Sequence, residues 1–176
     1  VMREAHRLGY KSTATMMYGH REKDEDILTH LEGIRQLQDE YQGFTAFVPW
    51  SFKPDNTPLG KTVPRRATPT RYLRIVALSR LYLDNFPHIQ ASWFSEGKKI
   101  GQIALHFGAD DFGGTLLEEN VHAAANFLNS ASAAECIQLI HGAGFDAAER
   151  NTLYEVKQVF PLGATDGPPG HKWESY

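Results

Sequence analysis

Residues 10–30 read YKSTATMMYGHREKDEDILTH and contain one complete strand-and-helix unit. The stretch up to Tyr18 is rich in residues that favour β-strands, and Gly19 ends it at a turn. Asp24 then begins an acidic first helical turn, and Ile27 and Leu31 recur on one helical face. A strand that leads directly into an amphipathic helix is the repeating unit of parallel α/β folds.

The same plan recurs three more times along the chain. The next strands are predicted at FTAFVPW (44–50), HIQASWF (88–94) and ADDFGG (109–114, with its exit loop). Helices are predicted to follow these strands, begun by Thr68 with Pro69, by Ser95, and by a capping box at Thr115 that opens a helix through Leu128. A second capping box at Ser132 predicts one more helix, which ends near Gly142.

Four parallel βα units amount to half of a (β/α)8 barrel, and a full barrel needs about 250 residues. An open four-stranded α/β sandwich remains the alternative, because periodicity alone does not separate the two. The Pro- and Gly-rich residues 161–176 are expected to be a disordered tail behind a domain of residues 1–160. Residues 1–8 resemble the last turns of a helix that Gly9 ends, so the chain is expected to be a piece of a longer protein.

Composition narrows the class of protein. A net charge of -3 over 176 residues argues against a nucleic-acid partner. No apolar run is long enough to span a membrane, and the charged N-terminal stretch has no signal-peptide core. One cysteine, Cys136, excludes an intrachain disulfide framework, so a cytoplasmic location is expected.

In parallel α/β folds, functional side chains lie beyond the carboxyl ends of the strands. The first exit offers Tyr18, Gly19, His20 and Glu22, which suit a nucleoside-like group or, equally, an ordinary turn. The second exit offers aromatic surface, a hydrogen-bonding amide and a basic loop, from Trp50, Phe52, Asn56 and Arg65.

The third exit offers Ser92 and Trp93, of which one at most faces a barrel interior. At the fourth exit, Asp111 and Glu119 are candidate catalytic carboxylates, and Gly113 offers a backbone amide. Acidic residues also favour a solvated helix start, which is the competing interpretation. His20 and His30 are too poorly spaced for a metal pair, so no metal ligand is predicted.

Three long stretches resemble a known family: residues 13–52, residues 72–93 and GQIALHFGADDFGGTLLEENV (101–121). They are similar to the C-terminal half of cyclic dehypoxanthine futalosine synthase, a radical S-adenosylmethionine enzyme of menaquinone biosynthesis by the futalosine route. The resemblance covers residues 1–154 and extends in part to aminofutalosine synthase and the deazaflavin (FO) synthase subunits. QASW and FGGTLLEENV are nearer to the cyclase.

The resemblance implies the C-terminal half of a radical-enzyme (β/α) barrel, S-adenosylmethionine and a [4Fe-4S] cluster. It also implies a 5′-deoxyadenosyl radical that takes a sugar hydrogen from dehypoxanthine futalosine, after which the carbon radical closes onto the benzoate ring. Position by position, it places the first exit along S-adenosylmethionine and the other exits on the substrate, at Trp50, Phe52, Ser92, Trp93, Asp111, Gly113 and Glu119.

One departure from the family bears on activity. The cluster needs three thiolates in a Cys-x3-Cys-x2-Cys motif, and this chain has only Cys136. The chain is therefore expected to need an N-terminal half-barrel as partner and to be inactive alone. A fragment of a sister enzyme, aminofutalosine synthase or a deazaflavin (FO) synthase subunit, is one alternative, and a non-catalytic half-barrel remnant or pairing module is the alternative from another class. Self-association through the free sheet edges is also expected to be possible.

Overall fold

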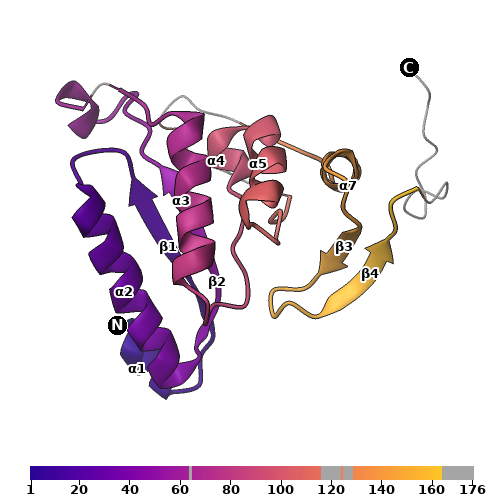
Figure 1. Ribbon diagram of the computed structural model, residues 1–176, viewed down its shortest axis with the longest axis horizontal. Helices are drawn as coiled ribbons and strands as arrows, with labels where there is room; N and C mark the ends of the chain where they lie inside the picture. Colours follow the sequence, from indigo (N-terminus) through magenta and orange to yellow (C-terminus); the bar gives the residue numbers. More distant parts are fainter. Residues whose placement is uncertain (64, 116–123, 125–128, 164–176) are drawn as a thin grey trace.

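The computed structural model describes residues 1–63, 65–115, 124 and 129–163 (Figure 1). Its elements, in chain order, are α1 (Met2–Arg7), β1 (Ser12–Tyr18), α2 (Asp24–Tyr41), β2 (Phe44–Ser51), the 3-10 turn η1 (Leu59–Lys61), α3 (Pro69–Tyr82), α4 (Trp93–Glu96), α5 (Lys98–Ala104), the 3-10 turn η2 (Leu105–Phe107), α7 (Ala133–Gly142), β3 (Ala147–Arg150) and β4 (Val156–Phe160).

The expected parallel order of the strand segments is confirmed. β1 pairs with β2 in parallel, with Tyr18 opposite Ser51. The third and fourth segments join the same array only through single parallel bridges, Phe47 with Ile89 and Gln90 with Asp111. The prediction of two further full strands is therefore wrong, although their placement is right.

Side chains replace ladder bonds at these two short segments. The Asp110 carboxylate accepts the Ile89 N–H at 2.8 Å, and the Tyr72 hydroxyl accepts the Ser92 N–H at 2.8 Å. The main chain then turns into α4 at Trp93. Backbone groups satisfied by side chains have no need of a sheet partner, so the strand ends there.

The predicted helix starts are confirmed at Asp24, where α2 begins, and at Thr68 and Ser132, but not at Ser95. Thr68 accepts the Arg71 N–H ahead of Pro69, and Ser132 accepts the Glu135 N–H. Ser95 does not cap a helix: it lies inside α4, and α5 begins only after Gly97 at φ +94°. The helix expected from Thr115 to Leu128 falls on residues outside the described part.

The core lies between the helices and one face of the sheet (Figure 1). Ala14, Met16 and Tyr18 alternate inward from β1 and pack in the cluster that includes Leu31 of α2 and Val76 of α3. The side chains between them, at positions 13, 15 and 17, are exposed on the opposite face. The sheet is therefore covered by helices on one side and open along β1 on the other, where Thr13, Thr15 and Met17 are exposed.

The residues after α7 form an antiparallel hairpin that was not predicted. β3 pairs with β4, with Ala147 opposite Phe160. Most of the expected tail, 164–176, lies outside the described residues. Within the part of the chain that the structure describes, no helix is long and apolar enough to cross a bilayer.

Candidate functional site

The first and second strand exits meet at the carboxyl ends of β1 and β2. The Phe52 N–H donates to the Tyr18 carbonyl at 2.7 Å. The His20 and Phe52 rings then lie edge to face, with centroids 6.1 Å apart. Two candidates from neighbouring strand exits are therefore in contact, with the Phe52 ring buried beneath the partly exposed His20 ring.

The Glu22 side chain folds back onto the backbone of the turn at the first exit. Its carboxylate accepts the Gly19 N–H at 2.6 Å and the His20 N–H at 2.9 Å, and its side chain is only 14% exposed. Burial alone would raise the pKa of Glu22, but these two amides and the nearby His20 ring bring the pKa below its ordinary value. Gly19 sits at φ +88°, and a Cβ there would lie 2.9 Å from the Ala67 Cβ, so the turn needs glycine.

Because the pKa of Glu22 is lower in the folded chain than in the unfolded one, its contribution to stability is present above its ordinary pKa of 4.5 and is lost as the pH falls through the folded value. We expect wild type to be more stable than Glu22→Gln at pH 6 and the gap to shrink steadily below about pH 4.5. Urea unfolding at several pH values measures this difference in stability between wild type and Glu22→Gln. The same comparison in a His20→Gln background is the control, because it removes the titratable ring next to Glu22. A gap that does not change with pH would contradict the assignment.

Two large residues of the site, Tyr18 and Trp93, are fully buried. The Tyr18 hydroxyl and Trp93 Nε1 have no hydrogen-bond partner among the described residues. Burial, followed by the charge of Glu96, raises the pKa of Tyr18. Trp93 stacks on Phe112 with ring centroids 6.3 Å apart, so it belongs to the core beneath the exits.

A buried ion pair joins the second and third exits, and it was not predicted. Lys53 Nζ lies 3.5 Å from Glu96 Oε1, with side chains 7% and 6% exposed. The Ser51 hydroxyl accepts from Lys53 and donates to Glu96 at 2.7 Å in each case, and the Ser51 N–H also donates to Glu96. Burial lowers the pKa of Lys53 despite this carboxylate. The pair fixes the end of β2 to α4.

The remaining candidates of these exits divide into buried and exposed side chains. The Ser92 hydroxyl donates to the Pro49 carbonyl at 2.7 Å and is fully buried. Trp50 is half-buried opposite Met17 in the ladder. Asn56 is exposed at φ +56° and lines a shallow pocket with Thr57 and neighbouring loop residues.

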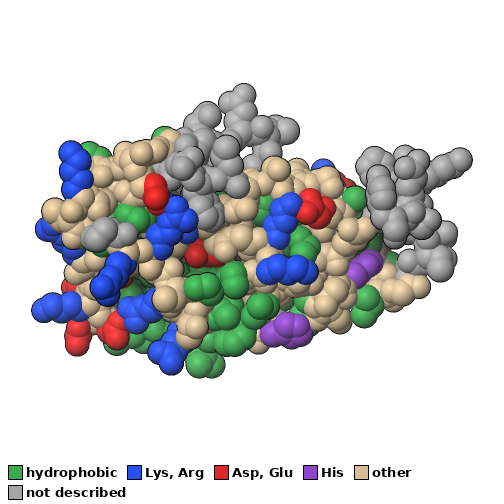
Figure 2. All heavy atoms as spheres, turned by 90° about the horizontal axis from the view of Figure 1, so that it is seen from above, with side chains coloured by type: hydrophobic (Ala, Val, Ile, Leu, Met, Phe, Trp, Pro, Cys, Tyr) green, Lys and Arg blue, Asp and Glu red, His purple; other side chains and the backbone are tan. Residues whose placement is uncertain are grey.

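The loop between β2 and α3 makes a basic rim around these exits. Arg65 is exposed, whereas Arg66 pairs with Asp55 in a two-nitrogen contact. Seen from above the strand ends, Lys and Arg side chains gather on this side of the molecule (Figure 2). The exits therefore combine aromatic surface with positive charge, which suits an aromatic or nucleoside-like ligand that carries an anionic group.

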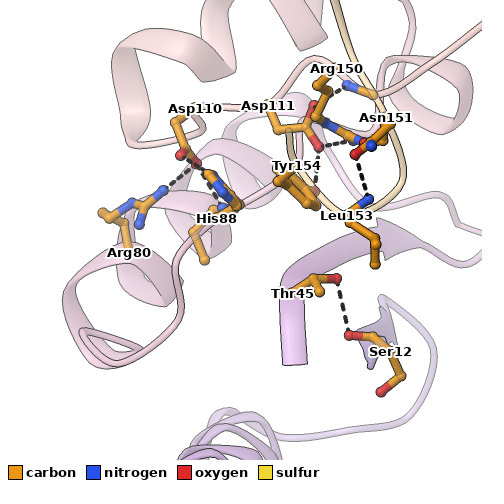
Figure 3. Close-up of polar contacts among 12 residues, drawn as sticks. Ser12, Thr45, Arg80, His88, Asp110, Asp111, Arg150, Asn151, Leu153 and Tyr154 are labelled. Carbon is orange, nitrogen blue, oxygen red and sulfur yellow. Dashed lines mark hydrogen bonds and ion pairs between the residues drawn. The ribbon is translucent and has the colours of Figure 1, made fainter. Parts of the chain in front are cut away.

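At the fourth exit, the Asp111 carboxylate is held by the C-terminal hairpin (Figure 3). Arg150 donates to both of its oxygens, and the Tyr154 hydroxyl donates to Oδ2 at 2.6 Å. The Gly113 N–H donates to Oδ1 at 3.0 Å. Asp111 is 8% exposed and serves here as an acceptor of four hydrogen bonds. Glu119, its predicted companion, lies outside the described residues.

Sequence reasoning missed Lys53, Glu96, Arg150 and Tyr154. Lys53 and Glu96 lie in the second and third strand exits, but nothing in their local sequence pattern pairs them. The sequence signal for the hairpin is weak: AAER (147–150) and VKQVF (156–160) do not alternate apolar and polar residues, and Asn151 is the one turn-favouring residue between them.

A [4Fe-4S] cluster does not fit this chain's own residues. The one cysteine, Cys136, lies partly buried in α7, and burial raises the pKa of its thiol, which disfavours the thiolate that a cluster needs. Among residues 1–63, 65–115, 124 and 129–163, no three His, Cys, Asp or Glu side chains are grouped to hold a metal ion.

Comparison with known proteins identifies the family. Residues 41–162 match the family model described as the CofH/MqnC C-terminal region. The chain is 42% identical over 159 residues to the cyclic dehypoxanthine futalosine synthase of Halalkalibacterium halodurans, covering 90% of this chain and 42% of that protein. The Streptomyces coelicolor protein of the same name is 45% identical over 167 residues, covering 94% and 41%.

A differently named relative is equally similar. The 5-amino-6-(D-ribitylamino)uracil--L-tyrosine 4-hydroxyphenyl transferase of Methanoculleus marisnigri is 46% identical over 158 residues, covering 88% of this chain and 43% of that protein. The chain spans less than half the length of these curated relatives. Since the family model matches most of its residues, the chain belongs to the CofH/MqnC C-terminal region family.

Proposed function

We propose that this chain is the substrate-side portion of a radical S-adenosylmethionine enzyme that cyclises dehypoxanthine futalosine in menaquinone biosynthesis. The observation that carries the proposal is 42% and 45% identity to two cyclic dehypoxanthine futalosine synthases over nine-tenths of the chain or more. In those proteins the matched region accounts for about two-fifths of the length. The whole reaction therefore requires a cysteine-bearing partner segment.

The geometry of the sheet supports a half-barrel. In an α/β sandwich both sheet faces are covered by helices, whereas the alternate side chains of β1, from Thr13 to Met17, are exposed opposite the helices. In a barrel this face is the inner wall. We propose that an N-terminal half docks along the free edge of β1, which in the described part of the chain pairs only with β2.

We assign the cofactor mainly to the first strand exit and the substrate to the second and third. His20, supported by the buried Phe52 ring, offers the side chain on which the adenosyl group of S-adenosylmethionine would lie, beside the Gly19–Glu22 turn. When bound in the whole enzyme, that cofactor with its cluster supplies the radical that starts the reaction. Trp50, Asn56 and Arg65 face the substrate from the second exit, while the buried Ser92 and Trp93 shape the wall behind it.

The second candidate function is the tyrosine transferase reaction. The 46% identity to the Methanoculleus marisnigri transferase favours it as strongly as the identities above favour the cyclase. We favour the cyclisation because the QASW and FGGTLLEENV segments resemble the cyclase more closely.

A two-half assay tests the proposal. The chain is mixed anaerobically with an N-terminal half of the Halalkalibacterium halodurans synthase that carries the Cys-x3-Cys-x2-Cys motif, and the cluster is reconstituted. We expect cyclic dehypoxanthine futalosine only in the mixture and from neither half alone. The two halves of the Halalkalibacterium halodurans synthase, recombined in the same way, are the positive control. A product formed from tyrosine and 5-amino-6-(D-ribitylamino)uracil would favour the transferase. If the positive control is active and the mixture forms no product, the chain would be a non-catalytic module.

Arg65 is expected to bind the benzoate carboxylate of the substrate. Removing a charge-assisted hydrogen bond in Arg65→Ala should raise the KM for dehypoxanthine futalosine about tenfold, with Arg65→Lys in between. Arg66→Ala is the matched control, because its guanidinium is already engaged by Asp55. An equal rise in both alanine variants would show that only general positive charge matters.

A further inference from the structure

The turn of the C-terminal hairpin is built to present one aromatic side chain. Asn151 organises it: its side-chain oxygen accepts the Leu153 and Glu155 N–H groups at 2.9 and 3.0 Å. The Tyr154 backbone lies in the left-handed region at φ +66°, which bulky side chains rarely adopt. A residue held in that conformation depends on its surroundings to keep it there.

Side-chain contacts supply that support (Figure 3). The Tyr154 ring stacks on His88 with centroids 3.9 Å apart and planes at 7°, and the Arg150 guanidinium carbon lies 3.8 Å from the ring centre. Two groups so close to one ring centre occupy opposite faces, because they would overlap on the same one. His88 is itself bonded to Asp110, which Arg80 of α3 also contacts. The Tyr154 ring is therefore held between Arg150 of the hairpin and His88 of the third strand segment.

The clamped ring acts on the fourth exit through Asp111. Arg150 and Tyr154 hold the carboxylate in one orientation, in which Oδ1 accepts the Gly113 N–H. Gly113 sits at φ +80°, and a Cβ there would lie 2.4 Å from the Gln90 side-chain nitrogen. The main chain at this exit is thus fitted between Gln90 on one side and the hairpin-held Asp111 on the other.

We propose that the turn Arg150–Glu155 is a latch on Asp111 that positions the backbone of the fourth strand exit at Gly113. Tyr154 and Arg150 are positioning residues, which act through Asp111 and not by contact with substrate. The inference takes from the proposed function only that Gly113 lies at the ligand site.

Hydrogen exchange of the Gly113 amide tests the latch on the chain itself, by NMR of 15N-glycine-labelled protein. Tyr154→Phe keeps the stacked ring and removes the hydroxyl that Asp111 accepts. We expect the Gly113 amide to exchange about tenfold faster in this variant, while other glycines, such as Gly33 of α2, keep their rates. Tyr10→Phe, at a hydroxyl-bearing ring that is 67% exposed, is the matched control and should change nothing.

Unchanged Gly113 exchange in Tyr154→Phe would overturn the latch, and so would an equal acceleration at every glycine, which would indicate general destabilisation. A second readout follows from the two-half assay, in which Tyr154→Phe should raise the KM for substrate more than it lowers kcat. A fall in kcat alone would contradict a positioning role. If the two-half mixture forms no product, the exchange result still decides the latch independently.

Discussion

Replacing Glu96 by alanine is expected to lower the free energy of unfolding by about 3–5 kcal/mol, because it leaves the buried Lys53 ammonium without its carboxylate. The same change removes the acceptor of the Ser51 N–H and of the Ser51 and Ser95 hydroxyls. Buried donors that lose their acceptor retain the full cost of desolvation. Urea unfolding at neutral pH measures the loss.

The double variant Lys53→Met/Glu96→Leu separates the ion pair from the packing around it. Replacing both partners by apolar residues leaves no unpaired charge but does not restore the acceptor of the Ser51 N–H, so we expect it to recover part of the stability lost in Glu96→Ala. Glu135→Ala is the surface control, since its pairing with Lys98 is much more exposed and should cost below about 1 kcal/mol. A double variant as unstable as the single one would show that the cost is not that of an unpaired charge.

Trp93→Ala is expected to cost about 3–5 kcal/mol through the cavity it leaves beneath the strand exits. The Trp93 side chain is fully buried, stacks on Phe112 and lies against Gly101, where a Cβ would come within 2.5 Å of the Trp93 Cβ. So close a fit of α5 against the Trp93 Cβ and Cα leaves the main chain little freedom to collapse into a cavity. Thermal and urea unfolding measure the effect.

Two further variants serve as comparisons for the stability loss expected in Trp93→Ala. Trp93→Phe keeps one aromatic ring and loses the rest of the indole, including an Nε1 that has no partner among the described residues, so it should be milder than Trp93→Ala. Trp50→Ala, at a half-buried position on β2, should cost clearly less than Trp93→Ala. If Trp50→Ala proved the more destabilising of the two, the assignment of Trp93 to the core would fail.

The local elements of the first half of the chain follow from sequence because their signals are local. β1 and α2 arise from side chains within a few residues of each other, and Gly19 marks the exit between them. The Thr68–Pro69 helix start holds for the same reason. By contrast, the third and fourth strands shorten to single bridges, because the Asp110 carboxylate and the Tyr72 hydroxyl take ladder bonds that no periodicity reveals.

The candidate site was predictable as a set of exits but not as a set of contacts. The parallel order of the strands implies that His20 and Phe52 lie together, and they do. Which oxygen of Glu22 accepts which amide, or that Ser92 turns its hydroxyl onto Pro49, depends on distances that a sequence does not contain.

The sequence by itself determined the α/β class, the parallel strand order and the family, since each depends on composition, periodicity or extended similarity. Only the tertiary structure decided that Lys53 neutralises Glu96, and that Arg150 and Tyr154 hold Asp111 across separations of 39 and 43 residues. The physical reason is burial: a charge removed from water must find a partner in space, and distance along the chain does not limit which one it finds.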